Sequence, residues 1–147
     1  MREVSRKYSI NRYRNDPVYK LKVCISNDIN RMLNTNGASK NGESCSKYLP
    51  FTFLELKQHL ENQFDIWMTW KNRGKYNPKT WKNDDISTWK WQIDHIIPKS
   101  EFPYTSMEDE NFRKCWALEN LRPYSAKQNI IDGATRIRHK KENINEN

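Results

Sequence analysis

The chain contains few cysteines, and they lie far apart. Cys24, Cys45 and Cys115 are the three among 147 residues. An odd number at these spacings matches neither a disulfide framework nor the paired cysteines of a zinc site. We therefore expect reduced thiols, as in an intracellular protein. Cys115, which precedes a tryptophan, should pack as a small apolar side chain.

Long apolar runs are also missing from the sequence. A membrane-spanning helix needs roughly 20 consecutive apolar residues, and a signal peptide needs an apolar stretch behind its first charges. The sequence shows neither pattern, and its first residues are charged and polar. We expect a protein without a membrane span, located inside the cell. The length predicts one domain over residues 1–147.

Basic and aromatic residues are abundant instead. The formal charge is +8, and 26 Lys and Arg accompany six Trp, seven Tyr and five Phe. Cations interleaved with aromatic rings suit a polyanion, because phosphates take the charges while the rings take sugars or bases. The alternative is a basic protein whose charge serves solubility alone.

The N-terminal half predicts a basic arm followed by helices. Residues 1–15 should form a mobile or partly helical arm, in which Arg12 and Arg14 either contact phosphates or are simply solvated. Asp16 and Pro17 then mark a helix start. One apolar face follows at helical spacing; it comprises Val18, Leu21, Ile25, Ile29, Met32 and Leu33.

A second helix and a tryptophan-rich segment, residues 65–90, follow. We expect residues 16–90 to form a helical support. Thr52 and Glu55 predict a capping box, and the apolar face of this helix comprises Phe53, Leu56, Leu60 and Phe64. His59 should be exposed or half-buried rather than a ligand. The segment 77–88 reads either as a DNA-contacting loop or as a surface excursion held by its tryptophans.

The chain is organised around residues 91–138. The segment from Trp91 to Pro98 is rich in β-branched residues and predicts a strand that Pro98 ends. Residues 99–113 read as a long loop, and Leu121 to Tyr124 as a second short strand. Ser125 is a candidate N-cap for a final helix.

Three side chains in this stretch suit metal-dependent cleavage of a phosphodiester. Asp94 offers a hard oxygen ligand, His95 a base that is neutral near pH 7, and Asn129 an amide oxygen. Such oxygen ligands favour Mg²⁺ or Mn²⁺ over zinc. Because neighbouring strand residues point to opposite faces, Asp94 and His95 converge only if the strand bends or ends there.

These residues resemble the signature of the HNH endonucleases. Segments 91–98, 120–123 and 126–129 read WQIDHIIP, NLRP and AKQN. They look most like the free-standing HNH nucleases of phages and other viruses. The resemblance implies a ββα-metal core over residues 91–140, with Asp94 and Asn129 as metal ligands. It also implies that His95 is the general base and that Asn120 holds the geometry that orients His95.

The same resemblance implies how DNA is contacted. In the family the last helix lies along the phosphate backbone, so cations of this region become candidate DNA contacts; these are Arg122, Lys127, Arg136 and Arg138. Some members carry a further histidine one turn after the last motif residue. Here that position is Gly133, which leaves metal positions to water and phosphate, as Mg²⁺ prefers.

The expected protein is therefore an α+β endonuclease. A mainly helical N-terminal half would pack on a ββα-metal core with two short antiparallel strands and a helix, and residues 141–147 would form a flexible tail. One Mg²⁺ (Mn²⁺ is possible) would support hydrolysis of double-stranded DNA, with nicking by a monomer; a homodimer or a specificity-giving protein partner stays open. The alternatives are a non-catalytic DNA-binding module, an RNA or structure-specific nuclease, and a homing or restriction enzyme.

Overall fold

The computed structural model describes residues 2–134, with side chains from residue 4 onwards. Arg136, Arg138 and the tail 141–147 therefore lie outside the described residues. About half of the described chain is helical, and a two-stranded antiparallel sheet accompanies the helices, which confirms the predicted α+β class. Contacts divide the chain into a first unit, residues 2–62 and 95–121, and a second unit, residues 63–94 and 122–134.

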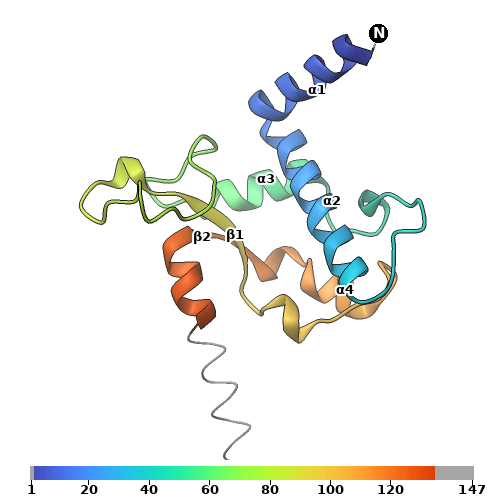
Figure 1. Ribbon diagram of the computed structural model, residues 1–147. Coiled ribbons are helices and arrows are strands. Elements are labelled where there is room, and N and C mark those ends of the chain that lie inside the picture. The colour runs from blue at the N-terminus through green and yellow to red at the C-terminus, as the bar shows by residue number, and fades with distance from the viewer. Residues whose placement is uncertain (1, 135–147) are drawn as a thin grey trace, which may run out of the picture. The chain divides into compact units, whose positions relative to one another are not determined.

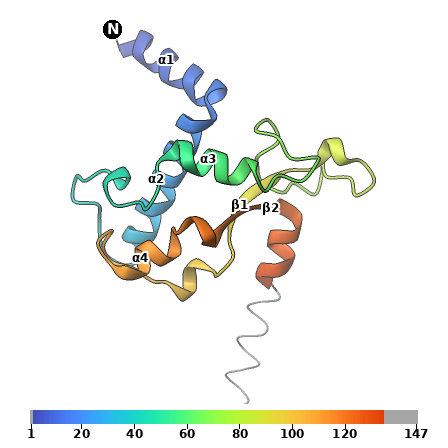
Figure 2. The same cartoon turned by 180° about the vertical axis from the view of Figure 1, so that it is seen from behind.

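The first unit is mainly helical. It contains the helices α1 (Arg2–Asn15), α2 (Pro17–Thr35), α3 (Phe53–Glu61) and α4 (Glu110–Cys115), with single 3-10 turns at Cys45–Lys47, Lys99–Glu101 and Leu118–Asn120. Helix α2 contacts both α1 and α3. Figures 1 and 2 show α1 extending from the N-terminal end of α2. The basic arm is thus helical, and nearly all of its described side chains are exposed.

Helix α2 forms as its sequence predicts. The Asp16 carboxylate caps it by accepting hydrogen bonds from the amides of Val18 and Tyr19, at 3.1 and 3.3 Å. Pro17 takes the first helical position, where a missing N–H costs nothing. The buried face comprises Leu21, Ile25, Ile29 and Leu33, all members of the predicted apolar stripe.

Helix α3 begins as predicted but ends earlier. Thr52 and Glu55 form both hydrogen bonds of the capping box, each 3.1 Å long. Leu56 and Leu60 are buried, but the helix ends at Glu61 and does not include Phe64. The prediction for Phe64 was wrong, because its ring packs in the second unit against Trp70 and Trp91, at 5.3 and 4.9 Å between centroids.

The segment 99–113 is more ordered than the long loop that we expected. The Asp109 carboxylate accepts hydrogen bonds from the amides of Thr105 and Ser106, at 3.0 and 3.2 Å. This turn leads directly into α4. Beneath it lies a core of buried side chains; these are Tyr104, Phe112, Cys115 and Trp116. Cys115 packs as a small apolar residue, as predicted.

The second unit contains the sheet except for His95 and Leu121, which belong to the first unit. Strands β1 (Trp91–His95) and β2 (Leu121–Ser125) pair, and a helix over residues 126–134 follows directly, in red in Figure 1. Backbone bonds from Ala126 N to Lys90 O and from Ile96 N to Asn120 O, 2.9 and 2.8 Å long, flank the ladder. They set a register that places Asp94 opposite Arg122.

This register also explains how a proline is tolerated in β2. Pro123 lies opposite Ile93, in a pair whose N–H groups point away from the partner strand. The sheet has two strands, so the nitrogen of Pro123 faces no third strand. The sequence NLRP is therefore compatible with a regular ladder.

The tryptophan-rich segment is tied to β1. Trp91 is fully buried, and its Nε1 donates to the carbonyl of Thr69 at 2.6 Å. Backbone bonds join Gly74 N to Trp91 O and Trp91 N to Asn72 O, at 2.9 and 3.2 Å. Residues 69–74 are therefore held beside β1 by this indole and by backbone bonds, whereas contact of residues 77–88 with DNA stays a prediction.

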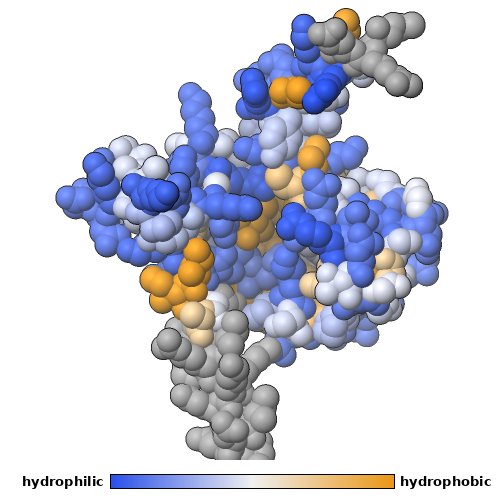
Figure 3. All heavy atoms as spheres, viewed as in Figure 1, coloured by the Kyte–Doolittle hydropathy of each residue, from blue (hydrophilic) through white to orange (hydrophobic). Residues whose placement is uncertain are grey.

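The surface is largely hydrophilic on the face that Figure 3 shows. An apolar patch lies over the helix 126–134, where Ile130 and Ile131 are both exposed. Among the described residues, no helix combines the length and the apolar character that crossing a bilayer requires.

Candidate active site

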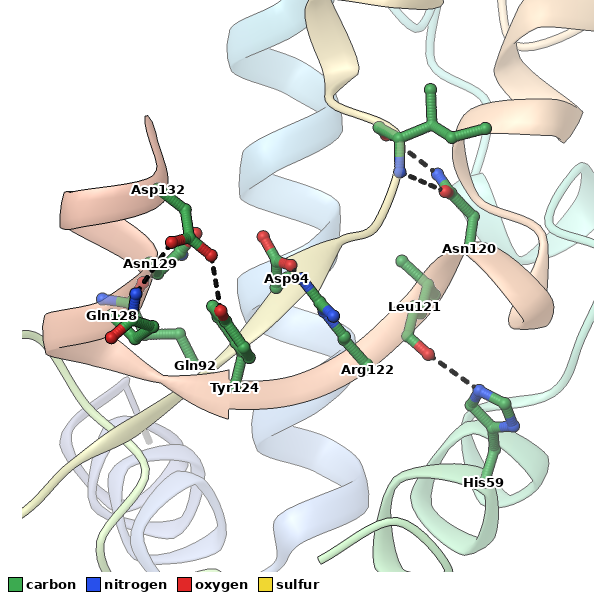
Figure 4. A network of polar contacts seen from close by, with 11 residues as sticks. His59, Gln92, Asp94, Asn120, Leu121, Arg122, Tyr124, Gln128, Asn129 and Asp132 are labelled. Carbon is green, nitrogen blue, oxygen red and sulfur yellow. Dashed lines mark hydrogen bonds and ion pairs between the residues drawn. The ribbon is translucent and has the colours of Figure 1, made fainter. Parts of the chain in front are cut away.

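Asp94, the first candidate metal ligand, is a buried carboxylate on β1. Its Oδ2 accepts a hydrogen bond from Nε of Arg122 at 2.8 Å, and only 5% of the Asp94 side chain is exposed. The guanidinium of Arg122 also lies over the ring of Tyr124, 4.1 Å from its centroid. Figure 4 shows the two charged side chains pointing toward one another. Arg122, which we predicted to contact phosphate, thus forms an ion pair with Asp94, the candidate metal ligand.

Asn129, the second candidate ligand, is held by β1. The amide nitrogen of Asn129 donates to Oε1 of Gln92 at 2.9 Å. This hydrogen bond involves the amide nitrogen of Asn129. The amide oxygen, which is the atom that ligates a hard cation, takes no part in it. Ser125 caps the helix that carries Asn129, because its Oγ accepts from the amide of Gln128 at 3.2 Å. The predicted N-cap is confirmed.

Asp132 is a further carboxylate of this region that the sequence analysis missed. Its two oxygens accept hydrogen bonds from the hydroxyl of Tyr124 at 2.5 Å and from Nε2 of Gln128 at 2.8 Å (Figure 4). The bond to Asp132 raises the pKa of Tyr124. Asp132 lies three residues after Asn129, a spacing that keeps both on one side of a helix.

His95, the candidate base, belongs to the first unit. Its ring packs edge-on against Trp116, with centroids 4.7 Å apart, and 8% of the residue is exposed. Burial lowers the pKa of His95 to about 4, and the charge of Lys99 lowers it further while that of Asp28 opposes the shift. The imidazole is therefore neutral at pH 7 and can accept a proton.

The Nε2 atom of His95 has an unusual environment. Among the described residues, two buried side-chain nitrogens have no hydrogen-bond partner, and they are Nη1 of Arg73 and Nε2 of His95. Leaving a buried polar atom unpaired costs about 1–3 kcal/mol. Such an atom marks a place where a water molecule or a substrate group would find a partner.

Asn120 ties together the chain around His95. Its amide oxygen accepts from the amide of Ile97 at 2.7 Å, and its amide nitrogen donates to the carbonyls of Ile97 and Cys115, at 3.2 and 2.9 Å. Asn120 thus binds the backbone two residues after His95 to the end of α4. The resemblance gives this residue a positioning role, and these contacts suit that role.

Other predicted residues have separate contacts. Nζ of Lys127 donates to Oδ1 of Asn83 at 2.6 Å in the second unit. Arg12 pairs with Asp16 at 3.6 Å and lies over Tyr19, whereas Arg14 is exposed on α1. His59 is half-buried, and its Nε2 is 2.9 Å from the carbonyl oxygen of Leu121, so it fills the structural role that we expected.

The donors present fit a hard cation that keeps most of its water ligands. Asp94 supplies a carboxylate and Asn129 an amide oxygen, which Mg²⁺ and Mn²⁺ both accept. The charge of Arg122 beside Asp94 would compete with such an ion. Among the described residues, no group of three or more His, Cys, Asp or Glu side chains is placed to hold a metal.

The chain is similar to two uncharacterized viral proteins. No family model matches the chain, and no solved structure does. An uncharacterized protein of Acanthamoeba polyphaga mimivirus is 30% identical over 121 residues, which are 82% of this chain and 45% of the relative. A second one from the same virus is 25% identical over 119 residues, 81% of this chain and 44% of that relative. The chain thus spans less than half the length of these curated relatives.

Proposed function

We propose that this chain is a metal-dependent endonuclease of the HNH type that hydrolyses phosphodiester bonds in DNA. The observation that carries the proposal is the unpartnered, buried Nε2 of His95. The residue before His95 is the carboxylate Asp94, at the end of a strand that pairs with a second strand and is followed by a helix. This order of elements and residues is the one that the resemblance implies.

The roles follow from what each side chain can do. His95 takes a proton from the water that attacks phosphorus, because its imidazole is neutral and its Nε2 lacks another partner. Asn120 positions His95 through the backbone at Ile97. Asp94 and Asn129 would hold a Mg²⁺ ion, whose charge would stabilise the charge that develops on the phosphate oxygens.

The charge of the chain supports a nucleic acid as the substrate, and the resemblance implies that it is DNA. A formal charge of +8 favours binding to a phosphate backbone. Exposed cations such as Arg14 would contact phosphates without reading the sequence. We propose low sequence specificity and nicking of one strand by a monomer, since the chain carries one such set of residues.

A second candidate function is supported by the ion pair between Asp94 and Arg122. A guanidinium that neutralises the candidate ligand suits a DNA-binding module without a metal and without catalysis. In that case the basic surface would bind DNA and His95 would have no chemical role. The two candidates differ in whether the protein cuts DNA.

Cleavage of a supercoiled plasmid with Mg²⁺, Mn²⁺ or EDTA tests the proposal. We expect nicked circles with either metal, none with EDTA, and a loss of at least about 100-fold in rate for His95→Ala, the size of a general-base contribution. His59→Gln is the matched control, because His59 is a half-buried histidine outside the motif. It should cut like the wild type.

The outcomes separate the candidates. A wild-type protein that binds the plasmid and never cuts it supports the binding module and overturns the nuclease. If His95→Ala cuts the plasmid as well as the wild type does, the protein is a nuclease but His95 is not its general base.

A further inference from the structure

The second unit contains a groove that the proposed catalytic residues do not use. It has a volume of about 470 Å³ and lies between the tryptophan-rich segment and the start of the helix 126–134. We call it the tryptophan groove, after Trp67, Trp81 and Trp89 in its wall. Its volume falls in the range of sites for small organic groups, which is about 300–1,000 Å³.

The aromatic wall is held in a fixed arrangement. Trp81 and Trp89 lie nearly parallel, with 6° between their planes and 6.0 Å between centroids, and Trp67 meets Trp89 edge-on at 5.4 Å. Nε1 of Trp89 donates to the carbonyl of Lys82 at 2.9 Å. All three tryptophans remain partly exposed. A planar ligand could therefore stack on them without ordering these side chains first.

The lining of the groove is polar as well as aromatic, and its charged residues are one cation, Lys127, and one carboxylate, Asp65. Lys127 reaches from the helix to Asn83 across 2.6 Å, and both residues line the groove. Six cations and three carboxylates occur in residues 63–90. The cations are Lys71, Arg73, Lys75, Lys79, Lys82 and Lys90, none of which lines the groove itself. The groove therefore suits a flat group with hydrogen-bonding edges, and the cations of the neighbouring segment suit phosphates attached to that group outside the groove.

We propose that the tryptophan groove binds unpaired nucleobases of single-stranded DNA. A single strand has the required chemistry, because its bases stack on aromatic rings while its phosphates meet the cations. Bases inside a duplex are stacked on one another and cannot enter such a groove. The inference rests on the proposed nuclease function, and it adds that the preferred substrate has unpaired bases beside the cleavage site.

Binding of two 12-nucleotide probes to the full chain tests this inference. The protein carries His95→Ala so that it does not cut. One probe is fluorescent oligothymidylate, and the other is an abasic strand with the same number of phosphates. We expect tighter binding of oligothymidylate and quenching of tryptophan emission by it alone. Equal affinity for both probes would show that charge alone binds the strand, and the inference would be overturned.

Substitutions locate the site. Trp81→Leu should weaken oligothymidylate binding by about 5- to 150-fold, the effect of losing one base–aromatic stack, and should leave abasic binding unchanged. Trp81→Phe keeps an aromatic face and should retain most of the affinity, which controls for misfolding. Ile86→Ala is the matched control, since Ile86 is exposed on the same segment outside the groove. If Trp81→Leu binds oligothymidylate like its parent, the inference is wrong.

Plasmid cleavage by the protein with intact His95 keeps the two proposals apart. Base-dependent binding without any cutting would refute the nuclease but support the groove. Nicking by a protein that does not distinguish the two probes would support the nuclease and refute the groove.

Discussion

Asn120 shows how one side chain can organise a site without taking part in its chemistry. Its amide makes three hydrogen bonds to backbone groups, and the residue is buried. These bonds fix the backbone just after His95. A small change in a backbone dihedral there would move the unpartnered Nε2 atom of the imidazole. The bond to the carbonyl of Cys115 is buried and the two bonds to Ile97 are partly buried, so these groups would lose partners that water replaces only in part.

Replacing Asn120 with alanine should therefore lower the free energy of unfolding by about 2–4 kcal/mol, because buried backbone groups lose their partners. The shift in the urea midpoint measures this loss. Asn111→Ala is the matched control. Asn111 makes one exposed bond, to the carbonyl of Pro103, so that variant should lose no more than about 1 kcal/mol. Equal losses in both variants would contradict the positioning role of Asn120.

Arg122 controls the charge of the candidate metal ligand. Its guanidinium neutralises a carboxylate that is almost fully buried. Removing Arg122 takes one positive charge away from this carboxylate, so a metal ion at Asp94 would meet less repulsion. The ion pair then acts as a competitor of any metal ion at this position.

We expect Arg122→Met to bind Mn²⁺ at least about fivefold more tightly than the wild type, since two unit charges about 4 Å apart interact by about 1 kcal/mol even in bulk water. Isothermal titration calorimetry measures the affinity. Arg113→Met removes the same charge from an exposed position on α4 and should change little. Weaker or unchanged binding by Arg122→Met would show that Asp94 is no metal ligand.

At the scale of elements, the helix that carries Asn129 depends on its cap. The Oγ of Ser125 satisfies the amide of Gln128 in the first turn. Losing such a cap costs about 1 kcal/mol. Asn129 lies in the same turn region, so its position depends on this local bond.

Ser125→Ala should therefore open the first turn of the helix. Hydrogen exchange at the amides of residues 127–130 should become about fivefold faster, which corresponds to a loss of about 1 kcal/mol. Ser125→Asp restores an acceptor at the same place and should keep the wild-type protection. If alanine and aspartate behave alike, the cap does not stabilise this helix.

Local signals predicted some elements well. The start of α2 and the capping box of α3 each depend on residues within one turn, so sequence alone revealed them. A strand beginning at Trp91 was also predicted, because β-branched and aromatic residues act locally, but it ends at His95 and leaves out Ile96 and Ile97. For the same reason, Ser125 was recognised as a cap.

Other contacts carried no signal that could be recognised in the sequence. Phe64 left the expected helical face because Trp70 and Trp91 offer it an aromatic cluster. The turn at Asp109 that begins α4 depends on backbone amides of Thr105 and Ser106, which carry no sequence signal. The spacing of three residues between Asn129 and Asp132 is visible in the sequence. The hydrogen bond from Tyr124 to Asp132 joins a strand to a helix, however, and no local pattern predicts it.

At the scale of the whole molecule, buried titratable groups link stability to pH. Cys115 is fully buried, and burial raises its pKa to about 12, with the charge of Lys99 opposing the shift. Burial also raises the pKa of Tyr104, whose hydroxyl oxygen accepts from Nε1 of Trp116 at 3.3 Å. Both groups keep their protons in the folded protein at pH values where an unfolded chain releases them.

Stability should therefore fall as the pH rises above about 9, the ordinary pKa of a thiol. Below that value both states hold the proton, and the contribution of Cys115 is fully present. Between about 9 and about 12 the unfolded state alone loses it, which costs up to about 1.4 kcal/mol per pH unit. Urea unfolding between pH 7 and 10.5 measures the slope.

Cysteine variants isolate this contribution from the many lysines and tyrosines that titrate in the same range. Cys115→Ala is less stable at pH 7 because it leaves a small cavity, but its stability should fall less steeply with pH than that of the wild type. Cys24→Ala is the matched control, since Cys24 is partly exposed, and it should keep the wild-type slope. Parallel slopes in all three proteins would mean that Cys115 does not keep its proton in the folded state, and thus that water reaches this part of the core.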